Sequence, residues 1–129
     1  MLANSASQTV IVTIVDVDEN APIIEGPSGA PGALASSKSV TQGTTAVFSF
    51  LADEAVTWSL VAGIGDVAAF TINPTTGALA FTAPPSFAAP TDVVAGDGVA
   101  GNNVYVVRVR ATDAQGYTSV QIVTVTVTP

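Results

Sequence analysis

The stretch that decides the fold is VYVVRVRATDAQGYTSVQIVTVTVT, residues 104–128. In its first part, Val104 to Thr112, the side chains alternate between two faces. One face carries Arg108 and Arg110, which favour water, so the opposite face is expected to lie in a hydrophobic core. The pattern therefore predicts a half-buried β-strand. Its inward face is predicted to consist of Tyr105, Val107, Val109 and Ala111.

A tight hairpin is predicted to join this strand to the next one. The loop DAQGY, residues 113–117, carries a glycine where a short turn needs a positive φ. The second strand, Ser119 to Thr128, alternates valine with threonine from Val123 onward. Val120 and Ile122 stand in the opposite phase, and this slip predicts a β-bulge near Ile122.

The rest of the chain is also typical of an all-β protein. Its 129 residues, 48% hydrophobic and 10% charged, correspond to one folded domain. Phe70–Leu79 predicts a second hairpin, with Gly77 in the turn. Further strands are expected over Ala46–Leu51 and Val56–Val61, and a mobile loop rich in Gly, Asp and Asn over Thr91–Asn103. Strands at this spacing predict a sandwich or a barrel.

Charge and composition exclude several functions. The net charge is −7 with only three basic residues, so the chain lacks the basic patch that nucleic-acid binding requires. It has no cysteine and no histidine, which removes disulfides, Ser-His and Cys-His catalysis and the usual zinc ligand sets. Asp53-Glu54 is better explained as a solvated loop than as a catalytic pair, so no enzyme is expected. No apolar run reaches the about 18 residues of a membrane span, and no direct membrane insertion is expected.

The two ends of the chain resemble each other. Residues 7–14, SQTVIVTI, match residues 120–127, VQIVTVTV, at a constant offset of 113. A duplicated strand is typical of a tandem array. We therefore expect 1–15 to be the last strand of a preceding repeat, 16–22 a linker and 23–129 a complete repeat. The alternative is that both segments are merely Thr/Val-rich strands.

The strand predicted at 8–15 has no sheet of its own in this chain. It could remain unpaired, pair with an exposed sheet edge, or compete for the position of 120–128. Pairing between copies would give a strand-exchanged dimer through residues 8–15.

The predicted linker is strongly acidic. Its sequence, DVDENAP, gathers three carboxylates and an amide at Asp16, Asp18, Glu19 and Asn20. Carboxylate and amide oxygens are the ligands that calcium takes, and crowded like charges repel one another unless a cation lies among them. An acidic, solvated hinge would have the same composition, and composition does not decide between the two.

The linker resembles the inter-repeat calcium motif of cadherins, D-x-N-D-N-x-P. Two further motifs of that family follow in the same order. FTINPTTGAL, residues 70–79, is similar to F-x-I-D-x-x-T-G-x-I, and YVVRVRATD, residues 105–113, is similar to Y-x-L-x-V-x-A-x-D. The likeness covers nearly all of 16–128, and its Thr/Val-rich texture resembles the cadherin-like repeats of large bacterial surface adhesins. It implies a seven-stranded Greek-key β-sandwich of the immunoglobulin-like kind.

The resemblance also implies calcium at the junction with the preceding repeat. The implied ligands are Asp16, Asp18, Glu19 and Asn20 in the linker, Asp113 after the Tyr105 strand and, as a weaker match in a shortened loop, Asp53 or Glu54.

Two departures concern the opposite junction, with a following repeat. Gln42 stands where the family has glutamate, and Ser86-Phe87-Ala88 lacks the carboxylates of an Asp-x-Glu element. A downstream calcium site is therefore expected to be weak or lost. Upstream binding is also expected to be weak in this chain, which omits most of the preceding repeat. A separate loop site is a further alternative, formed by Asp92, Asp97, Asn102 and Asn103.

The leading hypothesis is a non-catalytic repeat of a secreted or cell-surface adhesin, in which calcium stiffens the array. Its partners would be neighbouring repeats of the same chain and a homophilic or cell-surface partner. A calcium-independent spacer repeat and a carbohydrate-binding sandwich are the alternatives. A sugar site needs exposed aromatic rings, and only Tyr117 is expected to be exposed. The rings expected in the core are Trp58, Tyr105, Phe48, Phe50, Phe70, Phe81 and Phe87.

Overall fold

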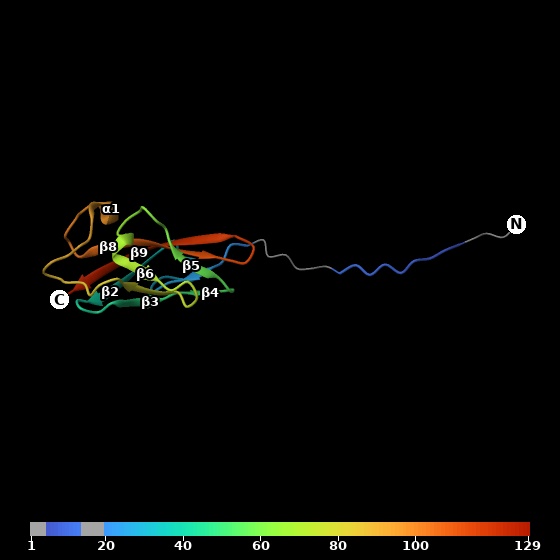
Figure 1. The fold of residues 1–129 in the computed structure, drawn as a ribbon, viewed down its shortest axis with the longest axis horizontal. Coiled ribbons are helices and arrows are strands. Elements are labelled where there is room, and N and C mark those ends of the chain that lie inside the picture. Colours follow the sequence, from blue (N-terminus) through green and yellow to red (C-terminus); the bar gives the residue numbers. More distant parts are fainter. Residues whose placement is uncertain (1–4, 14–19) are drawn as a thin grey trace.

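The computed structural model describes residues 5–13 and 20–129. Residues 20–129 form an elongated β-sandwich, and residues 5–13 form an extended segment without helix or strand (Figure 1). The strands are β1 (Ile24–Glu25), β2 (Ala35–Thr41), β3 (Ala46–Ser49), β4 (Leu51–Ala52), β5 (Thr57–Leu60), β6 (Phe70–Ile72), β7 (Ala78–Phe81), β8 (Val104–Thr112) and β9 (Thr118–Thr128). Two single turns of helix complete the elements, η1 (Val67–Ala69) and α1 (Val94–Asp97). Neither helix in the described residues is long or apolar enough to cross a membrane.

The strands form two facing layers. One sheet has the order β2-β9-β8-β5, and the other has the order β3-β7-β6. Beyond Phe50, β4 continues the line of β3 and pairs with β1. Strand β2 runs parallel to β9, whereas the other pairings are antiparallel. With β1–β2 and β3–β4 each counted as one interrupted strand, the described part of the chain has seven strands. The predicted all-β sandwich is confirmed.

The core lies between the two sheets and is built on β8. This strand has the predicted bounds, and its inward face is buried as expected, with Tyr105 1% exposed. The Tyr105 ring meets Phe81 edge-on at 5.2 Å between centroids. Trp58 is buried too, so the prediction that these rings belong to the core is confirmed. Phe87 is the exception: it is 40% exposed, because it lies in the irregular stretch after β7 rather than on a strand.

The predicted β-bulge in β9 is wrong. The register with β8 runs unbroken from Thr118 to Thr126. The phase slip arises because a polar residue, Gln121, occupies an inward position and is fully buried. Val120 and Ile122 consequently point outward, where they are 36% and 38% exposed. The rule that apolar side chains face inward fails here because Gln121 finds hydrogen-bond partners inside the core.

Two segments differ from expectation for the same reason, a polar composition. Strand β2, ASSKSVT, buries only Ser36 and Val40, so its pattern gave no strand signal. The loop over 91–103 was expected to be mobile, but it contains α1 and is anchored by carboxylates. Asp92, within the loop, and Asp66, outside it, are 4% and 3% exposed, and both accept backbone N–H groups of loop residues.

Candidate functional site

The chain enters the sandwich at the end formed by residues 20–23, the 53–57 loop and the 113–117 loop, here called the entry end (Figure 1). Two contacts fix the entering segment. The Ser119 hydroxyl donates to the carbonyl oxygen of Pro22, which is buried. Ile23 and Asp53 bond each other twice, through Ile23 N–H to Asp53 Oδ1 at 2.8 Å and Asp53 N–H to Ile23 O at 3.2 Å. Hydrogen bonds therefore hold Pro22 and Ile23, which follow the acidic stretch of the sequence, against the sandwich.

Asp113 is the most distinctive side chain at the entry end. Its Oδ1 accepts the backbone N–H groups of Gln115 and Tyr117, both at 2.9 Å, and so shapes the β8–β9 hairpin. Its Oδ2 is buried and has no hydrogen-bond partner. The residue is 7% exposed and borders a hollow of about 230 Å³ that residues 55–57 also line. A buried carboxylate oxygen without a donor is costly, and a cation or donor from outside the sandwich would relieve that cost.

The described residues include only some of the predicted calcium ligands. Asn20 is exposed at the entry end, and Asp53 and Asp113 lie at the same end of the sandwich. Asp16, Asp18 and Glu19 lie outside the described residues. Among residues 5–13 and 20–129, no group of three or more acidic, His or Cys side chains is close enough to hold a metal ion. The described residues therefore place Asp53 and Asp113 at the entry end but do not by themselves assemble a metal site.

The alternative loop site does not assemble, because its carboxylates already hold the loop together. Asp92 Oδ1 and Oδ2 accept the backbone N–H groups of Asn103 and Asn102 at 3.0 and 3.1 Å. Asp97 Oδ2 accepts the Asn102 side-chain amide at 2.7 Å, and Asp97 Oδ1 accepts the Val99 N–H. The hydrogen bond from the Asn102 side chain has the larger effect and that from the Val99 N–H the smaller, and both lower the pKa of Asp97. The four residues predicted as a loop site therefore bond to one another and stabilise the conformation of the 91–103 loop.

The opposite end of the sandwich, where β9 ends, is here called the exit end. It brings together the two departures noted in the sequence. Gln42 Oε1 accepts the Phe87 N–H at 3.1 Å, and Asn103 Nδ2 donates to Phe87 O at 3.0 Å. Gly43 N–H donates to Pro85 O at 2.8 Å. Neutral hydrogen bonds thus close this end at the positions where carboxylates were expected, next to Ala88.

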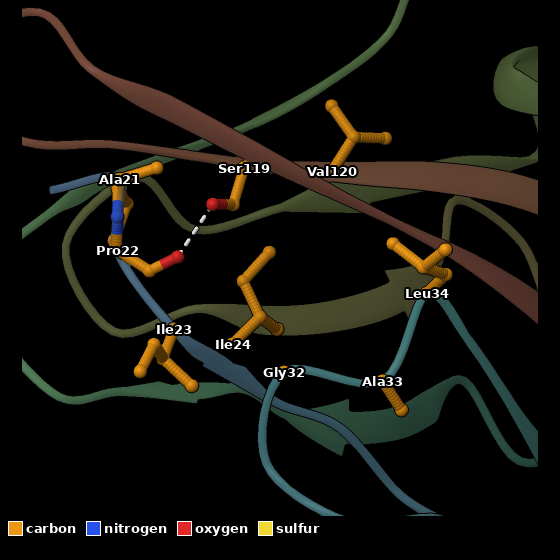
Figure 2. A pocket seen from close by; sticks show the side chains of 9 residues that line it. All are labelled: Ala21, Pro22, Ile23, Ile24, Gly32, Ala33, Leu34, Ser119 and Val120. Carbon is orange, nitrogen blue, oxygen red and sulfur yellow. Dashed lines mark hydrogen bonds between the residues drawn. The ribbon is translucent and has the colours of Figure 1, made fainter.

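Sequence reasoning missed two features near the entry end. The first is the buried Gln121, whose only sequence signal was the phase slip in β9. The second is an apolar hollow of about 320 Å³ beside the entering segment (Figure 2). Ile23, Leu34 and Val120 line it and remain 46%, 79% and 36% exposed. These side chains come from three separate segments, so no single stretch of sequence indicates the hollow.

The two sheets, the interrupted first strands and the β8–β9 hairpin define a cadherin-like β-sandwich. Among solved structures, the chain is similar to Drosophila N-cadherin EC1-4, with 21% identity and a TM-score of 0.58 over 84% of this chain and 25% of that one. It is similar to mouse clustered PcdhgC3 EC1-3, with 18% identity and a TM-score of 0.61 over 86% and 34% of the two chains. It is also similar to the extracellular domain of Protocadherin GammaB4, with 18% identity and a TM-score of 0.62 over 88% and 16%.

The chain thus spans between about a sixth and a third of the length of these structures. At such identities the likeness establishes the fold alone. No protein-family model matches the chain, and no curated protein matches it either.

Proposed function

We propose that the chain is a non-catalytic, adhesion-type repeat of a secreted or cell-surface protein, with calcium bound at its entry end. The observation that carries the proposal is the buried, unpartnered Oδ2 of Asp113. It lies at the end of the sandwich that the acidic linker enters. The residues that would hold the ion are Asp16, Asp18, Glu19, Asn20, Asp53 and Asp113.

Calcium supplies positive charge and takes six to eight oxygen ligands, which suits a cluster of carboxylates that repel one another. The chain's own residues do the rest. The Ile23–Asp53 pair and the Ser119–Pro22 bond hold the end of the linker in place. The apolar hollow next to them offers a surface that a preceding repeat would cover. The mechanical result would be a fixed angle between neighbouring repeats, with the domain boundaries at 1–15, 16–22 and 23–129.

The exit end supports a second candidate, a calcium-independent spacer. Gln42 and Asn103 close this end on Phe87 through neutral hydrogen bonds. A following repeat would find no carboxylate at Gln42 or Ala88. We therefore propose that any calcium site of this repeat lies at the entry end alone.

A carbohydrate platform has less support. The two exposed rings, Tyr117 and Phe87, are 42% and 40% exposed. They lie at the entry end and the exit end respectively, so they cannot stack on one sugar together.

Thermal unfolding tests the calcium proposal. We expect the melting temperature to rise with calcium over the level in EDTA, by several degrees when calcium exceeds the dissociation constant about 100-fold, which corresponds to ~2.7 kcal/mol. Asp113→Asn keeps the Oδ1 acceptor that shapes the hairpin and removes the charge, so it should abolish the rise. Asp97→Asn removes the same charge far from the linker, as a matched control, and should keep the rise.

An equal calcium response in Asp113→Asn and the parent chain would refute the entry site. A flat response in all three proteins would favour the calcium-independent spacer. Binding should strengthen in a longer chain that carries the carboxylates of a preceding sandwich.

A further inference from the structure

Residues 7–14 and 120–127 are most similar at the positions that face inward in β9. In β9 the inward positions are Gln121, Val123, Val125 and Val127, all of them fully buried. In residues 7–14 the corresponding positions are Gln8, Val10, Val12 and Ile14, of which three are identical. On the outward face, three of the four positions differ. Similarity concentrated on the buried face indicates two strands that fit the same core.

The glutamine makes this match specific. Glutamine is seldom fully buried, and Gln121 is buried only because its amide is satisfied inside the sandwich. The Ser36 hydroxyl donates to its Oε1 at 2.6 Å, and its Nε2 donates to Ala33 O at 2.8 Å. A Cβ at Gly26 would lie 1.9 Å from Oε1, so a glycine is needed there. A general Thr/Val-rich strand has no reason to carry glutamine at this position.

The first copy has the composition of a strand but no sheet. Val10, Ile11 and Val12 are 71%, 86% and 77% exposed, and residues 5–13 pair with no strand of the described part of the chain. Leaving such a run of β-branched side chains in water forgoes the free energy of burial. A sheet with an open position would therefore bind it.

That sheet is not the one in this sandwich. The position is filled by β9, which pairs along its length with β8 and, over Ile122–Thr128, with β2. If residue 14 took the place of Val127, the chain would have to return to Pro22, which lies beside Ser119 at the other end of the strand. Eight residues of strand span roughly 26 Å, and the eight steps from 14 to 22 reach only about 26–29 Å fully extended. No length would remain for the reversal of direction.

We propose that residues 8–14 are the last strand of a second sandwich built on the same core, which precedes residues 23–129 in the same protein. The strand fits between counterparts of β2 and β8, with Gln8 in the position of Gln121. The partner is recognised by a serine hydroxyl in the place of Ser36 and a glycine in the place of Gly26. This inference rests on the proposed tandem arrangement, but not on calcium, so a failed calcium titration would leave it intact.

A graft within the full chain tests the fit. Val120→Ser, Ile122→Thr, Thr124→Ile and Val127→Ile together give β9 the sequence of residues 7–14. Because the graft preserves the buried glutamine, we expect a cooperative transition within about 5 °C of the parent. A second graft that keeps Val127 shows how much of any change in stability comes from the methyl group that Val127→Ile adds to the core.

The control graft carries nearly the same residues shifted by one position, so that 120–127 read as residues 8–15. It places two threonines inward and the glutamine outward, and it should lose the cooperative transition. In the in-register graft, the Gln121 side-chain amide should remain protected from exchange in NMR spectra. If the in-register graft is as unstable as the shifted one, the proposal is overturned.

Binding in trans provides an independent test. In the full-length Val123→Asp/Val125→Asp variant, two buried charges prevent β9 from entering the core. A synthetic peptide of residues 5–15 should restore cooperative unfolding, as should a peptide of residues 118–128. The 5–15 peptide with Val10→Asp and Val12→Asp should not.

Without peptide, concentrated samples of this variant should form a dimer by light scattering, because residues 8–14 of one copy fill the open position of another. Rescue by the 118–128 peptide but not by the 5–15 peptide would overturn the proposal.

Discussion

Gly26→Ala should destabilise the sandwich far more than an ordinary glycine-to-alanine change. The new Cβ would lie 1.9 Å from Gln121 Oε1 and 2.8 Å from the Ser36 hydroxyl oxygen. The backbone does not resist the change, since Gly26 is not among the glycines with positive φ. The cost arises because the Gln121 side-chain amide must move away from its hydrogen-bond partners. Since the residue is fully buried, the displaced amide cannot bond to water instead.

The magnitude follows from the two hydrogen bonds that this movement breaks. Each buried polar group left without a partner costs about 1–3 kcal/mol, so breaking the two bonds is expected to cost about 2–6 kcal/mol. For a domain of this size, at ~4–8 °C per kcal/mol, even the lower end of this cost lowers the melting temperature by roughly 8–16 °C. Urea unfolding at equilibrium, with an unchanged m-value, would report the same loss as a lower midpoint.

A double-mutant cycle isolates the cause. Gln121→Ala alone should cost about 2–3 kcal/mol, because it leaves a cavity and an unpaired Ser36 hydroxyl. In that background the Gly26 Cβ has room, and Gly26→Ala should cost less than about 1 kcal/mol. If instead the two costs add within ~0.5 kcal/mol, the steric account of Gly26 is wrong.

Three further outcomes can be checked by similar means. Gly77→Ala should cost at least about 2 kcal/mol in urea unfolding, because Gly77 has φ 72° and its Cβ would lie 2.8 Å from the backbone oxygen of Phe50. Tyr105→Phe removes the hydroxyl that accepts the Thr91 N–H at 2.9 Å; it should cost about 1 kcal/mol and speed hydrogen exchange at Thr91, and an unchanged exchange rate would contradict this. Because hydrogen bonds lower the pKa of Asp97, its ionised form favours the folded loop: amide protection around Asn102 should be complete above about pH 4, weaken as pH falls through the folded pKa, and lose this pH dependence in Asp97→Asn.

The alternating pattern of β8 predicted its bounds and its buried face because nothing in that strand competes with hydrophobic burial. The same rule failed for β9, where the partners of Gln121 lie 85 and 88 residues away in sequence. It also gave no signal for β2, in which Ser36 faces inward because its hydroxyl donates to Gln121 Oε1 of β9. Polar side chains that are satisfied by distant residues cannot be assigned to a core from local sequence.

At the candidate site, too, local sequence predicted some features, whereas others depend on how distant residues pack. Asp113 could be singled out from its place after an alternating strand, and it lies at the entry end. Its unpartnered Oδ2 could not be predicted, since this depends on how the 53–57 loop packs beside it. Likewise, composition predicted a mobile loop over 91–103, and its anchor Asp66 could not be foreseen because it lies outside the loop in sequence. Asp66 binds Val93 N–H at 2.6 Å and Val106 N–H at 2.7 Å.

These anchors bear directly on calcium, because they reduce the number of carboxylates that are free to bind it. Asp66, Asp92 and Asp97 each use both oxygens as acceptors within the fold. Asp113 differs from them, since one oxygen shapes its hairpin and the other is buried without a donor. An acidic composition alone would spread calcium affinity over the whole surface. In the described residues, the carboxylates of Asp66, Asp92 and Asp97 instead accept backbone and side-chain N–H groups. For the proposed calcium site, this leaves the linker and the entry end.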